Sequence, residues 1–157
     1  MKIGEILCTK AVIIDLKATN KLEVIQEIIS SLVNAGAIDK KNKAKLIEIL
    51  MAREALGSTA IGQGVAIPHG KCEYVDKLTA ALGISKKGVD FDSLDGEPAY
   101  IFFLLVAPTD SAGPHLKALA RISHLLKDKY FRENLKNAKD DKTILKLIAQ
   151  EDERAPR

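Results

Sequence analysis

The sequence predicts an α/β fold, a sandwich in which a mixed, mostly central β-sheet is flanked by helices. Runs of β-branched and apolar residues alternate along the chain with segments whose apolar residues recur at helical spacing. The run at 99–107, AYIFFLLVA, is apolar almost throughout, as expected of a central strand covered on both faces. The 157 residues, 46% hydrophobic and 29% charged, fit one domain over residues 1–150. A C-terminal tail at 151–157 (EDERAPR) is expected to be solvated.

The chain opens with a predicted strand and two predicted helices. Residues 12–16 (VIIDL) are rich in β-branched side chains and predict the strand. Asn20 can cap the helix that follows, and Gly36 can end it. The apolar residues of this helix share one face: Leu22, Ile25, Ile28, Ile29, Leu32 and Val33. Asp39 is expected to cap a second helix that runs to about Leu56.

The pattern changes between Ser58 and Gly70. The sequence there, STAIGQGVAIPHG, has short apolar pieces separated by glycine and proline, which predicts two short extended segments joined by tight turns. Beyond it, residues 78–84 and 99–106 predict longer strands, with a turn at 92–98 between them.

The last third of the chain is predicted to be helical. Pro114 is a good first helical residue, so a helix is expected from there to about Lys127. Asp140 or Asp141 can cap a final helix that continues through about Ala149.

The composition excludes several classes of protein. Lys and Arg number 24 and Asp and Glu 21, so the net charge of +3 is too small to attract nucleic acid. Aromatic residues make up 4% and there is no Trp, which argues against base-stacking platforms. The longest apolar run, 99–107, is far shorter than the roughly 20 residues of a membrane helix, so no direct membrane insertion is expected. Two cysteines make no disulfide framework and the N-terminus lacks signal-peptide features, which predicts a cytoplasmic protein.

His69 is a candidate functional residue because its backbone is held rigidly. In AIPHGK, Pro68 fixes its own φ and restricts the preceding residue, and Gly70 frees the backbone after the histidine. The imidazole is therefore expected at a bend just after a short strand, where functional groups are common. A surface histidine beside a turn is the alternative, and the local pattern leaves both interpretations open.

His115 is predicted to lie on the buried face of the helix that begins at Pro114. Successive helical residues rotate by about 100°, and the apolar residues within about 40° of His115 are Leu119, Ile122 and Leu126. The position is also the positive end of the helix. His115 is therefore either a neutral core histidine or a histidine that helps to hold an anion there.

His124 falls about 180° from His115 on the same helical wheel. It shares that side with the cationic residues Lys117, Arg121 and Lys127. We therefore predict a solvated histidine that takes no part in a site.

Arg53 follows Leu46 and Leu50 along one stripe of the second helix, near its C-terminal end. A guanidinium is always charged, and burying it unpaired is costly, so it needs a carboxylate or phosphate partner. The side chain is expected to face a bound anion, to form a structural ion pair, or to extend to the helix end.

Two histidines, an arginine, a glycine-rich turn and a helix N-terminus together suit a phosphoryl group. A neutral imidazole is nucleophilic near pH 7, and one ring nitrogen attacks while an acceptor fixes the proton on the other. The phosphoryl oxygens need donors nearby. There is no Walker A pattern for a nucleotide-dependent kinase, and Gly62-Gln63-Gly64 leads into an extended segment, which is not how a dinucleotide-binding motif continues.

A metal site is the rival interpretation. His69 and Cys72 are three residues apart, His115 offers a third ligand, and zinc accepts nitrogen and sulfur ligands. The sequence has no second cysteine nearby, no HExxH motif and no clear fourth ligand. We therefore predict no metal and no cofactor.

The segment 53–71, REALGSTAIGQGVAIPHGK, resembles the active-site region of bacterial phosphotransferase system (PTS) enzyme IIA components of the fructose, mannitol and nitrogen-regulatory class (EIIA type 2). The resemblance continues through GVDFDSLDGEPAYIFFLLVAP and GPHLKALARISHLL and covers nearly the whole chain. The arginine, the Ser-Thr pair, the spaced glycines and the IPH triplet are specific in combination. The family fold is a three-layer sandwich with a mixed, mostly central β-sheet flanked by helices.

The resemblance implies a phosphocarrier, a phosphotransferase component of a fructose-type PTS. It implies that His69, in the IPH triplet, accepts a phosphoryl group from the phosphocarrier HPr and passes it to the cysteine of a IIB component for sugar uptake. His115 and Arg53 match the family's second histidine and its arginine, and are implied to stabilise the phosphoryl group. Ser58 and Thr59 match the pair before the first short strand and are implied to line the site.

Two alternatives stay open. In the nitrogen-regulatory branch the phosphorylation state of His69 controls binding to target proteins, because a phosphoryl group adds about two negative charges. A non-catalytic or metal-binding interaction domain is the more distant alternative. The intact His69, His115 and Arg53 argue against it.

Overall fold

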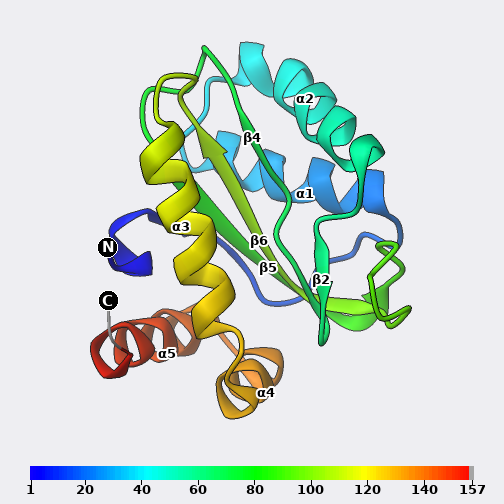
Figure 1. The fold of residues 1–157 in the computed structure, drawn as a ribbon, viewed down its shortest axis with the longest axis vertical. Coiled ribbons are helices and arrows are strands. Elements are labelled where there is room, and N and C mark those ends of the chain that lie inside the picture. Colours follow the sequence, from blue (N-terminus) through cyan, green and yellow to red (C-terminus); the bar gives the residue numbers. More distant parts are fainter. Residues whose placement is uncertain (156–157) are drawn as a thin grey trace.

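Helices α1 (Lys21–Asn34) and α2 (Lys43–Leu56) cover one face of a six-stranded sheet, and α3 (Ala112–Leu125) covers the other (Figure 1). This arrangement, in a computed structural model that describes residues 1–155, confirms the predicted three-layer sandwich. Helices α4 (Lys129–Asn137) and α5 (Asp141–Arg154) pack on the same side as α3. Within residues 1–155 no helix is both long enough and apolar enough to cross a membrane.

The sheet is mixed, and its central strand is the apolar run identified in the sequence. The strands are β1 (Leu7–Ile13), β2 (Ala60–Gly62), β3 (Val65–Ala66), β4 (His69–Lys71), β5 (Thr79–Val89) and β6 (Ala99–Ala107). Their order is β1-β5-β6-β3-β2, and β4 also pairs with β6. β5 runs antiparallel to β6, whereas β3 and β4 run parallel to it. All residues of β6 except Tyr100 are buried, as a strand covered on both faces requires.

Alternation along β6 divides the interior into two cores. Successive side chains of a strand point to opposite faces, so Phe102 and Leu104 pack with α1 and α2, whereas Phe103 and Leu105 pack with α3, α4 and α5. Each face of the sheet therefore buries its own apolar layer.

The start and end of α1 follow their sequence signals. The Asn20 side chain accepts a hydrogen bond from the Glu23 main-chain nitrogen at 2.9 Å, and Gly36 takes a φ of 78° just beyond the helix. Leu22, predicted on the apolar face, is 42% exposed, because that face is shifted toward the fully buried Val24. Asp39 caps a short 3-10 turn that leads into α2.

The segment that carries His69 forms three short strands where two were expected. β3 and β4 lie one after the other along the same side of β6, and Pro68, which has no N–H, separates them. The Pro68 carbonyl still accepts from the Leu105 nitrogen at 2.9 Å, and His69 lies opposite Leu105 in the parallel pair. The chain leaves β6 at this same end and enters α3, so the first turns of α3 lie near His69.

The helical third of the chain differs from the prediction in two respects. Helix α3 begins at Ala112, so Pro114 is its third residue and not its first. Helix α4 was not predicted. Asp128 caps it, accepting from the main-chain nitrogens of Tyr130 and Phe131.

The expectation of a solvated tail is wrong for Glu151 and Asp152, whereas Glu153 and Arg154 are exposed. Helix α5 does not end near Ala149 but continues through Arg154, and both Glu151 and Asp152 are buried. The helix continues because the buried Asp152 carboxylate binds the other end of the chain: it accepts from the main-chain nitrogens of Ile3 and Gly4, each at 2.9 Å. Residues 156–157 of the expected tail lie outside the described residues.

Arg121 is likewise misplaced by the helical wheel. The wheel puts it on the same side as His124, which was predicted to be solvated, but Arg121 is 7% exposed and its Nη2 lies 3.3 Å from the Asp152 carboxylate. The wheel assumes a single buried face, whereas α3 packs against the sheet and also against the α5 region. His124 is exposed, as predicted.

Candidate functional site

Three of the predicted site residues meet at one open depression of about 440 Å³. Arg53 comes from the last turn of α2, His69 from the start of β4 and His115 from the first turns of α3. The remaining side chains are one further cation, Lys71, and a set of apolar residues: Ile49, Ala112, Leu116 and Leu119. The depression therefore combines two imidazoles and two cations with an apolar surround.

The His69 ring is oriented by its own strand. It is half-buried, and its Nδ1 lies 2.8 Å from the main-chain oxygen of Ile67. A carbonyl oxygen can only accept, so Nδ1 carries the proton and Nε2 keeps its lone pair. The nitrogen free for chemistry is thus Nε2.

His115 lies beside His69 and has unused hydrogen-bonding capacity. The ring centroids are 5.4 Å apart and the rings are edge-on, at 72°. His115 is 5% exposed, and its buried Nε2 has no hydrogen-bond partner among residues 1–155. An unpaired buried nitrogen is costly, and a ligand oxygen in the depression can supply the missing partner.

Arg53 fits two of the three roles predicted for it: it extends to the end of its helix, and it faces the depression where an anion could bind. Its Nη1 donates to the main-chain oxygen of Gly57 at 2.8 Å, which places the guanidinium at the end of its own helix. The same side chain lines the depression with His69 and His115. The bond to Gly57 uses one of five guanidinium donors and leaves the others for an anion.

Both histidines have pKa values below the ordinary value for histidine. Burial is the main cause for His69, and the positive charge of Arg53 lowers its pKa further, while the bond to Ile67 and the charge of Glu54 act in the opposite direction. Burial also lowers the pKa of His115, with smaller effects from His69 and Lys71. Both rings are therefore neutral at pH 7, the form in which an imidazole is nucleophilic.

These lowered pKa values give a testable dependence of stability on pH. Between the ordinary histidine pKa of about 6.5 and the folded-state values, the unfolded chain binds more protons than the folded protein. The histidine contribution to the free energy of unfolding is therefore expected to be complete above about pH 6.5 and to be lost as the pH falls through the folded-state pKa values. Urea unfolding across this range tests it. A variant with His69→Gln and His115→Gln should lose less stability on acidification, and an equal loss in both proteins would contradict the assignment.

Ser58 and Thr59, expected to line the site, do not line this depression. The Ser58 hydroxyl donates to the main-chain oxygen of Phe91 and accepts from the Ala60 nitrogen. Thr59 is buried, and its hydroxyl donates to the carboxylate of Glu54. The structure thus brings together Arg53, His69 and His115 at the depression. Ser58 and Thr59 lie outside it and bind Phe91 and Glu54 instead.

Lys71 and Glu54 were missed as site residues. Lys71 is two residues after His69 on the same strand, so period-2 alternation offered a signal for it. Glu54 offered none, because a glutamate beside an arginine in a helix is ordinary and only the folded chain shows that it is buried.

The metal interpretation finds no matching geometry. Cys72 is buried, and its Sγ accepts from the Tyr74 nitrogen at 3.4 Å. No group of three or more His, Cys, Asp and Glu side chains in the described part of the chain is arranged to hold a metal ion.

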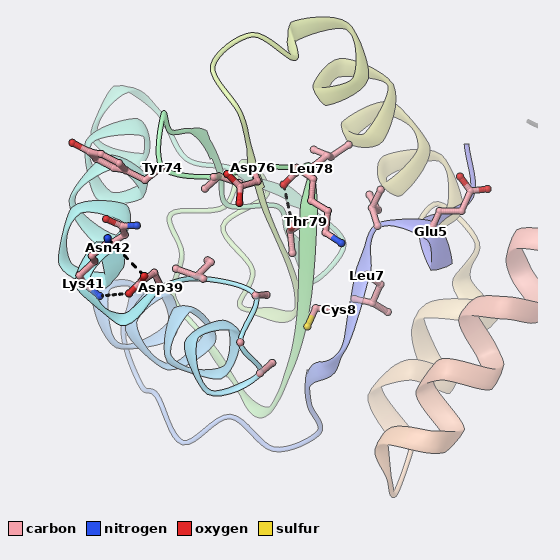
Figure 2. Close-up of a pocket in the computed structure, with 17 residues that line it drawn as sticks. Glu5, Leu7, Cys8, Asp39, Lys41, Asn42, Tyr74, Asp76, Leu78 and Thr79 are labelled. Carbon is pink, nitrogen blue, oxygen red and sulfur yellow. Dashed lines mark hydrogen bonds and ion pairs between the residues drawn. The ribbon is translucent and has the colours of Figure 1, made fainter.

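A wider depression of about 890 Å³ lies beside edge strand β1 and the loop before β5, and none of the predicted site residues lines it (Figure 2). Some of its polar groups have local hydrogen-bond partners. Figure 2 shows Asp39 bonded to Lys41 within one loop, and Thr79 donates to the Lys77 main-chain oxygen at 3.0 Å.

Known proteins resemble the chain over almost its full length. A nitrogen regulatory protein from Bradyrhizobium diazoefficiens is 36% identical over 149 residues, 95% of each chain. The fructose-specific EIIABC component of the PTS from Bacillus subtilis is 38% identical over 152 residues, but the chain spans only 24% of that longer protein. The crystal structure of nitrogen regulatory protein IIA-Ntr from Neisseria meningitidis superimposes with a TM-score of 0.84 at 33% identity, covering 93% of this chain and 98% of that one.

The family match agrees with the site geometry. Residues 5–151 match the family described as "Phosphoenolpyruvate-dependent sugar phosphotransferase system, EIIA 2". That range contains both histidines and the arginine of the depression. The chain therefore belongs to the EIIA 2 family of the phosphoenolpyruvate-dependent sugar phosphotransferase system.

Proposed function

We propose that this protein is a phosphocarrier that accepts a phosphoryl group on Nε2 of His69 from phospho-HPr and passes it to a protein acceptor. One observation carries the proposal: the bond from Nδ1 to the Ile67 oxygen leaves Nε2 unprotonated in a depression that also holds Arg53 and His115. The lowered pKa of His69 keeps the ring neutral at pH 7. Membership of the EIIA 2 family agrees with a role in phosphotransfer.

The transfer balances without an added acid or base. The Nε2 lone pair attacks the phosphorus of the donor phosphohistidine, the donor's P–N bond breaks, and its electron pair returns to the leaving imidazole. Nδ1 of His69 keeps its proton throughout and donates it in a hydrogen bond to the Ile67 oxygen. In the second step a cysteine thiolate of the acceptor attacks phosphorus, the P–Nε2 bond breaks, and neutral His69 is restored.

The groups around His69 suit the charge of the transferred phosphoryl oxygens. The guanidinium of Arg53 provides positive charge and donors, and His115 Nε2 provides a hydrogen-bonding nitrogen with no other partner in the described chain. Ala112 and Gly113 are exposed residues in the first turn of α3, and their main-chain N–H groups contribute to the positive end of that helix. Catalysis by such a site consists of positioning and charge stabilisation.

The acceptor distinguishes two forms of this function. In the first, a fructose-type IIB component receives the phosphoryl group for sugar uptake, as favoured by the 38% identity to the fructose-specific relative. In the second, phosphorylation of His69 switches binding to a regulatory target, as favoured by the nitrogen regulatory relative and the IIA-Ntr structure.

Intact-mass measurement after incubation with phosphoenolpyruvate, enzyme I and HPr tests the proposal. We expect one phosphoryl adduct, labile in acid, and a phosphorus–nitrogen NMR coupling that places it on Nε2. Adding a fructose-type IIB component then separates the two forms. Loss of the adduct to the IIB cysteine supports the transport role, and retention supports the regulatory one. A protein that gains no adduct from competent phospho-HPr contradicts the phosphocarrier assignment.

A further inference from the structure

A buried carboxylate, Glu54, lies one residue beyond Arg53 near the C-terminal end of α2, and the phosphoryl chemistry above does not use it. Its side chain is 2% exposed. Burial deprives the carboxylate of water, and the end of the helix adds partial negative charge, so both effects disfavour it there. Such a group needs compensating partners, and those partners indicate what it does.

Glu54 receives hydrogen bonds and positive charge from two other segments of the chain. The Thr59 nitrogen lies 3.2 Å from Oε2, and the Thr59 hydroxyl donates to Oε1. Lys21 Nζ, from α1, lies 3.2 Å from Oε2 and also 3.1 Å from Asp92. The carboxylate therefore fastens the start of the 58–71 segment to α2, and Lys21 compensates its charge.

Two hydrogen bonds, both made by the main chain of Ile67, connect Thr59 to His69. The Ile67 nitrogen donates to the Thr59 oxygen at 3.0 Å, and the Ile67 oxygen accepts from His69 Nδ1 at 2.8 Å. A single residue, Ile67, thus contacts Thr59 with its N–H and the imidazole with its carbonyl. Where that carbonyl lies decides which ring nitrogen carries the proton.

We propose that Glu54 is a positioning residue: through Thr59 and Ile67 it holds the His69 ring with its proton on Nδ1 and Nε2 open. The inference rests on the proposed function, in which Nε2 takes the phosphoryl group. Glu54 does not line the depression and acts through the residues between it and His69. Its negative charge also partly offsets that of Arg53 at the imidazole.

The variants Glu54→Gln and Asp152→Asn form a matched pair for the test. Both residues are buried carboxylates that accept from main-chain N–H groups and pair with a cation, Lys21 in one case and Arg121 in the other. Both changes are expected to lower the free energy of unfolding. Only Glu54 is connected to His69, so only its variant should change the imidazole.

Two measurements on the full chain give the result. The first is the pair of imidazole ¹⁵N chemical shifts of unphosphorylated His69 at about pH 8, where an ordinary histidine is neutral. The second is the rate of phosphorylation by phospho-HPr. Glu54→Gln is expected to shift His69 toward a mixture of both tautomers and to slow phosphorylation about 10-fold or more, the scale on which outer hydrogen-bond partners of functional histidines act. Asp152→Asn is expected to leave the His69 chemical shifts unchanged and the phosphorylation rate within about 2-fold of wild type. Glu54→Asp, which keeps the charge, is expected to recover part of the rate.

Unchanged His69 shifts and a wild-type rate in folded Glu54→Gln overturn the proposal. Equal changes in Asp152→Asn also overturn it, because the effect is then general loosening of the fold. If Glu54→Gln does not fold, the variant Thr59→Val takes its place. It removes the hydroxyl that donates to Glu54, and the ¹⁵N chemical shifts of His69 are measured in the same way.

The two proposals fail in distinguishable ways. The tautomer is measured without any phosphoryl donor. A wild-type protein that is not phosphorylated, but whose His69 tautomer responds to Glu54→Gln, contradicts the proposed function and supports the link. A wild-type protein that is phosphorylated, with no response to Glu54→Gln, contradicts only the positioning role.

Discussion

Replacing His69 with glutamine is expected to abolish phosphoryl uptake, a loss of at least about 1,000-fold. Glutamine is uncharged, like neutral His69, and close to it in length, so the change removes the imidazole without adding a charge. An amide nitrogen has no available lone pair, however, and forms no bond to phosphorus. Intact-mass measurement after incubation with phosphoenolpyruvate, enzyme I and HPr reads the result directly.

His124→Gln is the matched control for this experiment. His124 is an exposed histidine on α3, the helix that carries the buried His115. Its replacement is expected to leave the rate and extent of phosphorylation unchanged. If His69→Gln still gained the adduct and His124→Gln did not, the phosphoryl group would reside on α3 and the assignment of His69 would be wrong.

Replacing Asp152 with alanine is expected to cost about 3–5 kcal/mol of unfolding free energy, the range for breaking a buried ion pair. The Asp152 side chain is 3% exposed and accepts from the main-chain nitrogens of Ile3 and Gly4 and from Arg121. Without the carboxylate, the donors of Ile3, Gly4 and Arg121 lose this acceptor, and the N-terminal turn is no longer fastened to α3 and α5. Thermal unfolding should show a midpoint lower by about 10 °C.

Glu153→Ala supplies the comparison, since Glu153 is the next residue on the same helix. Its side chain is 71% exposed and pairs with Lys2 at the surface. An exposed ion pair contributes about 0–1 kcal/mol, so a small change is expected. Equal losses from Asp152→Ala and Glu153→Ala would mean that any change in the last turn of α5 unfolds it, and that the buried carboxylate has no special role.

Much of the fold was predictable because its signals are local. Asn20 and Asp140 each accept a main-chain hydrogen bond at the start of a helix, and Gly36 takes the positive φ that ends one. The run at 99–107 is apolar on both faces because both faces are covered. Such features depend on residues within a few positions of one another.

The errors occurred where distant packing overrides a local pattern. The helix that follows Asp128 was not predicted from the sequence because most of its residues are polar. In the structure its Phe131 and Leu135, four residues apart, are buried. Arg121 and the 151–154 segment read as solvated because they are charged. Arg121, Glu151 and Asp152 are nevertheless buried, because Arg121, Asp152 and the N-terminal turn meet only in the folded chain.

The sequence by itself determined the α/β class, the rigid bend that carries His69 and, by resemblance, the family. Only the tertiary structure decided how the site is assembled. β4 pairs in parallel with β6, and the chain enters α3 from the same end of β6. The ring centroids of His69 and His115 therefore lie 5.4 Å apart. Hydrogen bonds then favour one tautomer: His69 Nδ1 donates to the Ile67 oxygen, the Ile67 nitrogen donates to the Thr59 oxygen, and the Thr59 hydroxyl donates to Glu54. These contacts link residues from α2, from β4 and from the segment between them. Their geometry depends on how the chain packs and not on which residues are neighbours in the sequence.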